Sequence, residues 1–307
     1  MITRQSWRVI ILAINPDLTL ARSILLGAGR ARVASVGDLT ELLADWPVDR
    51  AAAGVTDAAG TRAVGGDPGW RGRTASVSKL LVGMAALVAV EEGAIELNEP
   101  AGPPGATVRH LLAHASGLAF DQDRVLTRPG TRRIYSNVGI ERFAEHLAAR
   151  TGIRFAEYLQ QAVLDPLGMA DTALTGSPAH DIVSTVDDLL RFARELLSPA
   201  LIVAETLAEA TSAQFPELAG VLPAVGRFDP NPWGLTFELR DGKHPHWTGM
   251  RNSAQTFGHF GGSGAFLWVD PVAGLGCVAL TDREFGPWAL AAWPPFSDAV
   301  LAGYPAG

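Results

Sequence analysis

A serine and a lysine three residues apart form the first group in this sequence that could carry out covalent catalysis. In Ser76-Val-Ser-Lys79 the hydroxyl and the amine would share one face of a helix, because residues i and i+3 are neighbours on a helix surface. An amine buried among apolar side chains loses its proton more easily and can then deprotonate a serine. The spacing predicts Ser76 as the nucleophile and Lys79 as its base. The motif alone equally fits a serine N-cap followed by a lysine that reaches solvent.

Lysine is rare in this chain, which gives Lys79 more weight. Of 25 basic residues only Lys79 and Lys243 are lysine, and all others are arginine. An amine can lose its proton, whereas a guanidinium stays protonated in proteins. A lysine in the apolar run over residues 76–92 therefore points to acid–base chemistry.

Two later segments carry groups that such a reaction also needs. Tyr135-Ser-Asn137 follows the turn-forming Arg128-Pro-Gly130, and its phenol and amide could relay protons and hold a substrate carbonyl. The glycine-rich segment 256–264 leads into an apolar strand, where the Gly262 N–H could complete an oxyanion hole with the N–H of Ser76. Taken singly, a packed tyrosine beside an N-capping residue and a plain β-turn or bulge are the simpler interpretations.

The elements that must position these residues follow a strand, helix, strand order. Apolar runs over 50–56 and 61–64, with a turn at 57–60, predict an antiparallel pair. Helical patterns dominate residues 105–215, and strands return after Pro230. This order predicts an α/β protein of the α+β type: an antiparallel sheet from both chain ends, flanked by helices, with an inserted all-helical lobe at about 99–220. The expected helices cover 76–92, 108–115, 139–151, 155–164 and 185–197, and the expected later strands cover 233–239, 264–269 and 275–281.

In this order the three motifs resemble the superfamily of serine β-lactamases and penicillin-binding proteins. The nearest branch contains class C β-lactamases, D-alanyl-D-alanine carboxypeptidases and family VIII carboxylesterases. Residues 76–79 match S-x-x-K, residues 135–137 match Y-x-N, and His259-Phe260-Gly261 lies where the family has K-T-G or H-x-G. The similarity runs from about residue 45 to the C-terminus. We expect a hydrolase domain over 36–307, preceded by an extension over 1–35 that lacks a clear periodic pattern.

The resemblance implies a serine acyl hydrolase. Ser76 would attack an acyl carbon, Lys79 and Tyr135 would exchange protons, and water would hydrolyse the acyl-enzyme. Asn137 would contact the substrate and the lysine. The remaining substrate-binding and oxyanion positions implied by the resemblance are His259, Gly261 and Gly262.

Phe260 departs from the family pattern, and this departure bears on the substrate. The threonine or serine of the family offers a hydroxyl to the carboxylate of a penicillin or a D-alanyl peptide, and phenylalanine cannot. With His259 in place of lysine, the positive charge there becomes dependent on pH. We expect hydrolysis of neutral esters or amides. D-alanyl-D-alanine carboxypeptidase or weak β-lactamase activity is the alternative, and a non-catalytic binding or scaffold protein on the same fold is the alternative of another class.

Charge and composition narrow the partners. A net charge of -7 without a basic stripe argues against nucleic acid and leaves a small ester, amide or lactam as the expected partner. The apolar run 9–14 is too short to span a membrane, so a cytoplasmic protein without a membrane span is expected. Cys277 lies in an apolar run and is interpreted as an inert buried thiol. The oligomeric state is left open.

Two other enzyme classes find weaker support. Residues 261–265 imitate the G-x-S-x-G elbow of α/β-hydrolases, but no histidine follows His259 in the sequence. Two histidine pairs, at residues 110 and 114 and at residues 244 and 246, could be considered as metal ligands. The first pair lacks the glutamate of H-E-x-x-H, and the second lies beside an expected turn. We therefore expect neither a metal nor a cofactor.

Overall fold

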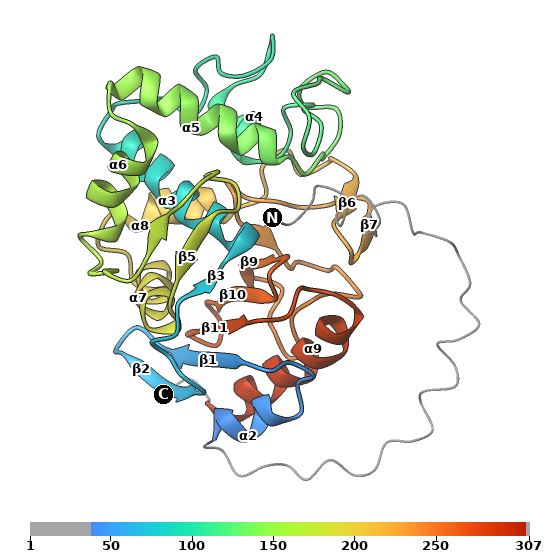
Figure 1. Ribbon diagram of the computed structural model, residues 1–307. Helices are drawn as coiled ribbons and strands as arrows, with labels where there is room; N and C mark the ends of the chain where they lie inside the picture. Colours follow the sequence, from blue (N-terminus) through green and yellow to red (C-terminus); the bar gives the residue numbers. More distant parts are fainter. Residues whose placement is uncertain (1–37, 305–307) are drawn as a thin grey trace.

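The computed structural model describes residues 38–304, and its centre is a six-stranded antiparallel sheet (Figure 1). The strand order is β2-β1-β11-β10-β9-β8. β1 pairs with β11 from Ala51 opposite Thr281 to Thr56 opposite Gly276. The prediction of an antiparallel sheet built from both chain ends is therefore confirmed. The strands of this sheet are β1 (Ala51–Thr56), β2 (Thr61–Gly65), β8 (Glu238–Leu239), β9 (Phe257–Gly261), β10 (Ala265–Asp270) and β11 (Leu275–Thr281).

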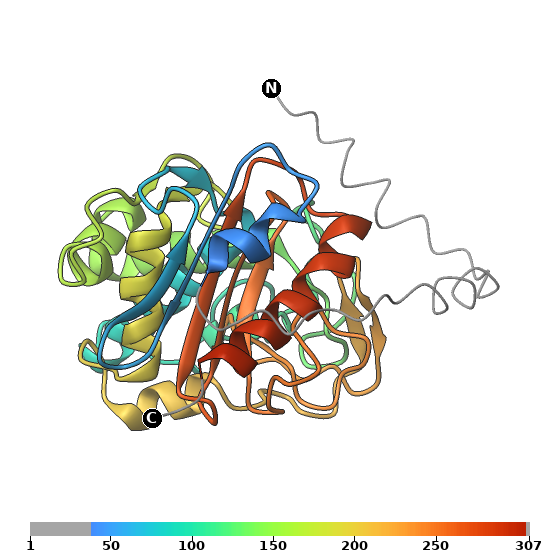
Figure 2. The ribbon, with the colours of Figure 1, turned by 90° about the horizontal axis from the view of Figure 1, so that it is seen from below.

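Helices cover both faces of the sheet and bury two separate apolar cores (Figure 2). One face packs against α3 (Ser78–Glu91) and α7 (Val186–Leu197), and the other against α2 (Leu39–Ala44) and α9 (Pro287–Gly303). Successive residues of β10 and β11 enter opposite cores, because side chains alternate across a strand. Since both faces are covered, these strands are apolar at nearly every position instead of alternating with polar residues.

Helices are the main regular elements between residues 99 and 220, but the prediction of an all-helical lobe was wrong in one respect. Two short strands pair with each other there, and the second also pairs with the strand just before Ser76. Strands of two or three residues are too short for a period-two pattern, so periodicity does not reveal them. The strands are β3 (Gly72–Arg73), β4 (Ala173–Leu174) and β5 (Ile182–Ser184), and the helices are α4 (Val108–Leu112), α5 (Asn137–Thr151), α6 (Phe155–Leu159) with a π-helical turn (Gln160–Leu164), α7, and α8 (Ala204–Ala210).

One predicted strand is mostly a turn. Of residues 233–239 only Glu238–Leu239 form β8. The Gly234 N–H donates to the Phe237 carbonyl at 2.8 Å, and Thr236 has a φ of 68°, so the chain reverses direction before the strand. A small hairpin, β6 (Gly220–Leu222) with β7 (Gly226–Phe228), precedes it.

The helix α9 was not predicted from the sequence. Its sequence contains Pro294 and Pro295, and proline in a helix interior removes a backbone hydrogen bond. Apolar packing compensates, because Trp293 and Phe296 are buried against Phe266 of β10. Burial of its aromatic side chains therefore keeps this segment helical despite the two prolines.

The remaining sequence-based expectations have mixed outcomes. Cys277 is buried in β11, as predicted, and burial raises the pKa of its thiol. No helix among residues 38–304 is long and apolar enough to cross a membrane. The proposed extension over 1–35 lies outside the described residues, so the division of the chain at residue 36 stays a prediction.

Candidate active site

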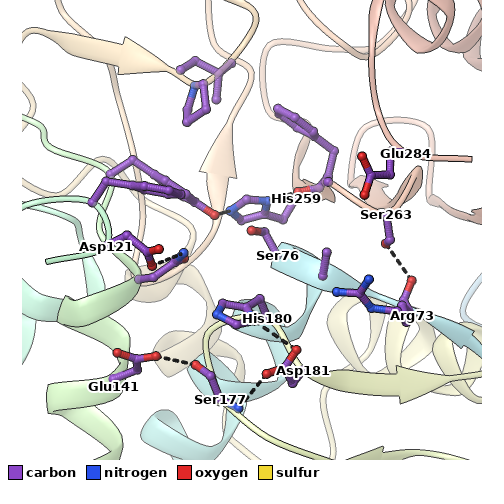
Figure 3. Close-up of a pocket in the computed structure, with 18 residues that line it drawn as sticks. Arg73, Ser76, Asp121, Glu141, Ser177, His180, Asp181, His259, Ser263 and Glu284 are labelled. Carbon is purple, nitrogen blue, oxygen red and sulfur yellow. Dashed lines mark hydrogen bonds and ion pairs between the residues drawn. The ribbon is translucent and has the colours of Figure 1, made fainter. Parts of the chain in front are cut away.

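Ser76 lies in a tight turn that projects into a cleft of about 650 Å³ (Figure 3). The turn is a 3-10 helix, Ala75–Val77, between β3 and α3, so the predicted helix over 76–92 begins as α only at Ser78. Ala75 has a φ of 43°, in the left-handed region that L-residues seldom adopt. Thr74 holds this turn, because its hydroxyl donates to the Ile182 carbonyl at 2.8 Å.

Gly261 of β9 explains how closely this turn approaches the sheet. A Cβ at Gly261 would lie 2.2 Å from the Thr74 carbonyl oxygen and 3.2 Å from the Ser76 backbone nitrogen. Any side chain there would push the turn away from β9. The next residue, Gly262, lines the cleft together with Ser76.

Lys79 is fully buried and lies beneath Ser76, one turn along. Its Nζ lies 3.2 Å from Ser76 Oγ, 2.7 Å from Asn137 Oδ1 and 2.9 Å from the Ala179 carbonyl oxygen. Burial lowers the pKa of Lys79 to about 7, although the charges of Glu141 and Asp121 act in the opposite direction. The alternative of a serine N-cap followed by a lysine that reaches solvent is excluded by the burial of Lys79.

The partners of Lys79 match a neutral amine. A neutral amine has two N–H donors and one lone pair. The amide oxygen of Asn137 and the carbonyl of Ala179 can only accept, so they take the two N–H groups. The third partner, the Ser76 hydroxyl, can accept from an ammonium, and it can equally donate its proton to the lone pair of a neutral amine.

Tyr135 lies on the other side of the nucleophile. Its hydroxyl lies 3.2 Å from His259 Nε2, and both side chains line the cleft together with Ser76. The Nδ1–H of His259 donates to the Phe260 carbonyl at 2.6 Å, which leaves Nε2 to accept from the phenol. Burial raises the pKa of Tyr135, so the phenol keeps its proton and remains a donor.

His259 is neutral in this setting. Burial, with a further contribution from the nearby charge of Lys79, lowers the pKa of His259 to about 3. The expected pH-dependent positive charge at this position is therefore absent near neutrality.

Asn137 begins α5 and joins the lysine to the cleft. Ser136 caps that helix, because its Oγ accepts from the Gly139 N–H at 2.9 Å. Asn137 Oδ1 accepts from Lys79, and its Nδ2 donates to Asp121 Oδ1 at 3.4 Å. The side chain lines the cleft, as a substrate-binding amide must.

A scan against protein-family models matches the chain over residues 44–301 to the family described as β-lactamase. This chain belongs to the β-lactamase family. The resemblance stated from the motifs is thus confirmed, and most of the chain lies within the family match.

Three proteins that are similar to this chain are described as different kinds of enzyme. The chain is similar to a solved β-lactamase from Mycobacterium bovis at 55% identity and a TM-score of 0.85, over 86% of this chain and 98% of that one. It matches a D-alanyl-D-alanine carboxypeptidase/endopeptidase, AmpH of Escherichia coli, at 26% identity over 34% of this chain and only 37% of that protein. EstCE1, described as a hydrolase with promiscuous acyltransferase activity, shares the fold at 16% identity and a TM-score of 0.69, over 85% of this chain and 96% of that one.

Within this β-lactamase-family cleft, Phe260 belongs as much to the core as to the cleft. Its ring is 5% exposed and lies 4.7 Å from the ring of Phe285 and 5.6 Å from that of Trp247, centroid to centroid. It also lines the cleft. Because the Phe260 ring also lies 6.4 Å from that of Trp293 in α9, a change at Phe260 alters packing between the sheet and α9 as well as the substrate surface.

Several polar residues of the cleft were missed by the sequence analysis. They come from the segment after α4, from α5 and from the loop between β4 and β5, and they carried no motif of their own. The only available signal was that the neighbouring segments resemble the family. That resemblance does not tell which polar side chains line the cleft and which lie on the outer surface. They are Asp121, Glu141, Ser177, His180 and Asp181.

Proposed function

We propose that this protein is a serine acyl hydrolase that works through an acyl-enzyme on Ser76. The observation that carries the proposal is the partner set of Lys79: two acceptors and one serine hydroxyl around a buried amine whose pKa is lowered to about 7. A neutral amine in contact with a serine hydroxyl is the requirement for a general base in this position.

The geometry supports the following sequence of steps. Lys79 takes the Ser76 proton as Oγ attacks the acyl carbon, and the N–H groups of Ser76 and Gly262 donate to the oxyanion. The Tyr135 phenol gives its proton to the departing alkoxide and is reprotonated from Lys79. Water then hydrolyses the acyl-enzyme and releases the acid.

The charges of the cleft favour a neutral substrate. Among the described residues that line it, four are carboxylates, and Arg73 is the single side chain with a permanent positive charge. With His259 neutral and Phe260 offering no hydroxyl, an anionic substrate would lose its hydration and meet four carboxylates against the one permanent positive charge of Arg73. We therefore assign neutral esters or amides as the substrate class. The carboxylates are those of Asp121, Glu141, Asp181 and Glu284.

The first experiment asks whether the chain forms an acyl-enzyme. The protein is mixed with a fluorophosphonate probe or a short-chain nitrophenyl ester, and the mass of the adduct is located by peptide mapping. Labelling at Ser76 that disappears in Ser76→Ala supports the hydrolase. The absence of labelling between pH 5 and 9 would instead support the scaffold alternative.

A second experiment tests the substrate class through Phe260. We expect a higher kcat/KM for the nitrophenyl ester than for a chromogenic cephalosporin, and Phe260→Thr should shift the ratio toward the cephalosporin by roughly ten- to a hundred-fold, the scale of one satisfied polar group. Because Phe260 is packed against Phe285, the unfolding transition of the variant is recorded in parallel. A parent protein that already prefers the cephalosporin would favour the β-lactamase alternative.

A further inference from the structure

A histidine and an aspartate line the same cleft as the nucleophile. His180 and Asp181 lie in the loop between β4 and β5, and His180 lines the same cleft as Ser76 (Figure 3). His180 Nδ1 lies 3.1 Å from Asp181 Oδ1. A histidine held at one ring nitrogen by a carboxylate has its other nitrogen directed elsewhere, as in a general base with its orienting partner.

The carboxylate of this pair is itself held in place. Asp181 Oδ2 accepts from the Ser177 N–H at 2.9 Å. A Cβ at Gly176 would lie 2.5 Å from the same oxygen, so a side chain at residue 176 would displace the carboxylate. Burial alone would raise the pKa of Asp181, but the Ser177 N–H and His180 lower it on balance, and the group stays ionised.

The loop is fastened to the nucleophile's helix on both sides of His180. The residue before it, Ala179, accepts from Lys79 Nζ at 2.9 Å. Two residues after it, the Ile182 N–H donates to Ser78 Oγ at 3.2 Å. These bonds fix the position of His180 relative to Ser76 without a long flexible connection.

The side chain of His180 is also open to water. It is 36% exposed, whereas the Lys79 and Tyr135 side chains are buried, and Lys79 Nζ is in contact with Ser76 Oγ. The residues that serve acylation are therefore buried, and His180 carries the one accessible imidazole among the described residues of the cleft.

We propose that His180, oriented by Asp181, is the general base of deacylation, a role that rests on the acyl-enzyme proposed above. His180 Nε2 takes a proton from water as the water oxygen bonds to the acyl carbon. The bond between that carbon and Ser76 Oγ then breaks, and Oγ receives a proton from the Lys79–Tyr135 pair. The pair regains its proton from the His180 imidazolium through water in the cleft, and the acid is released.

The test separates the two half-reactions. The full-length protein is mixed with a short-chain nitrophenyl ester in a stopped-flow instrument, and quenched samples are weighed by mass spectrometry. In His180→Ala and His180→Gln the nitrophenol burst should keep its rate within about two-fold, while steady-state turnover falls by about 10²-fold or more and acyl-Ser76 accumulates. Added imidazole should restore turnover in His180→Ala. Asp181→Asn should give a smaller loss of the same kind.

Two controls make the result decisive. His244→Ala, at an exposed histidine that does not line the cleft, should leave both phases unchanged. Wild-type protein without a Ser76-dependent burst would overturn the acyl-enzyme and this inference together. A normal burst in the wild type, with His180 variants that turn over at the wild-type rate or lose burst and turnover equally, would overturn the role of His180 alone.

Discussion

The two lysines of this chain are both buried, yet their surroundings differ. Lys79 Nζ contacts two oxygen acceptors and a serine hydroxyl. Lys243 Nζ contacts three acceptors: the Pro232 carbonyl at 2.8 Å, the Leu239 carbonyl at 2.7 Å and the Glu238 carboxylate. Three acceptors require the three N–H groups of an ammonium, whereas a hydroxyl both accepts and donates, so the partners of Lys79 suit a neutral amine as well as an ammonium.

The charged groups around the two lysines also differ: a carboxylate binds Lys243 directly, and among the described residues none binds Lys79. Burial lowers the pKa of both amines, but Glu238 opposes this effect at Lys243 from within the same ion pair. Glu238 also accepts from His246 and Trp247, so the pair belongs to a fully bonded network beside β9. At Lys79 the carboxylates of Glu141 and Asp121 act only from a distance. A buried lysine thus serves structure when a carboxylate binds it, and can serve as a base when none does.

The largest expected effect comes from removing the carboxylate at Lys243. Glu238→Gln leaves a buried ammonium without its counter-charge, and breaking such a pair costs about 3 to 5 kcal/mol of unfolding free energy. Denaturant unfolding measures the loss. Adding Lys243→Met to this variant should recover part of it. A single variant within about 1 kcal/mol of the wild type would show that the pair does not hold the ammonium form.

Replacing each lysine in turn by arginine compares the two residues through the rate of acylation. Lys79→Arg should reduce the rate of acylation by about 10²-fold or more, because arginine stays protonated and cannot act as a base. Lys243→Arg keeps the charge that Glu238 needs and should leave the acylation rate within a few-fold of wild type. Burst kinetics measure both, with unfolding curves to verify that each variant is folded. Equal losses in the two variants would remove the distinction between the lysines.

A smaller effect concerns the pH dependence of acylation. Lys79 must be neutral to act, so the acylation rate should rise with pH through about 7 and then level off. The Glu141 charge raises the pKa of Lys79, so Glu141→Gln should move this limb to lower pH. Glu145→Gln, on the same helix but paired with Arg142, is the matched control. A shift to higher pH would contradict the assignment of the limb to Lys79.

The sequence predicted the parts of the site that are local in the chain. Ser76 and Lys79 are neighbours through helix periodicity, and the burial of Lys79 follows from its apolar flanks. Sequence spacing could not reveal His180 and Asp181, because their place in the cleft of Ser76 depends on the pairing of β5 with β3. The helix α9 and the turn before β8 were missed for a related reason: tertiary packing overrides local preference at Pro294 and reverses the chain at Thr236.

The protonation of Lys79 can be measured directly, because the chain contains only two lysines. Protein labelled with carbon-13 at the lysine ε position should give two resonances, which Lys79→Arg and Lys243→Arg assign in turn. We expect the Lys79 resonance to titrate near pH 7 while that of Lys243 keeps its ammonium shift over the same range. A Lys79 resonance that stays at its ammonium position up to pH 9 would contradict the account of Lys79 as the base that activates Ser76.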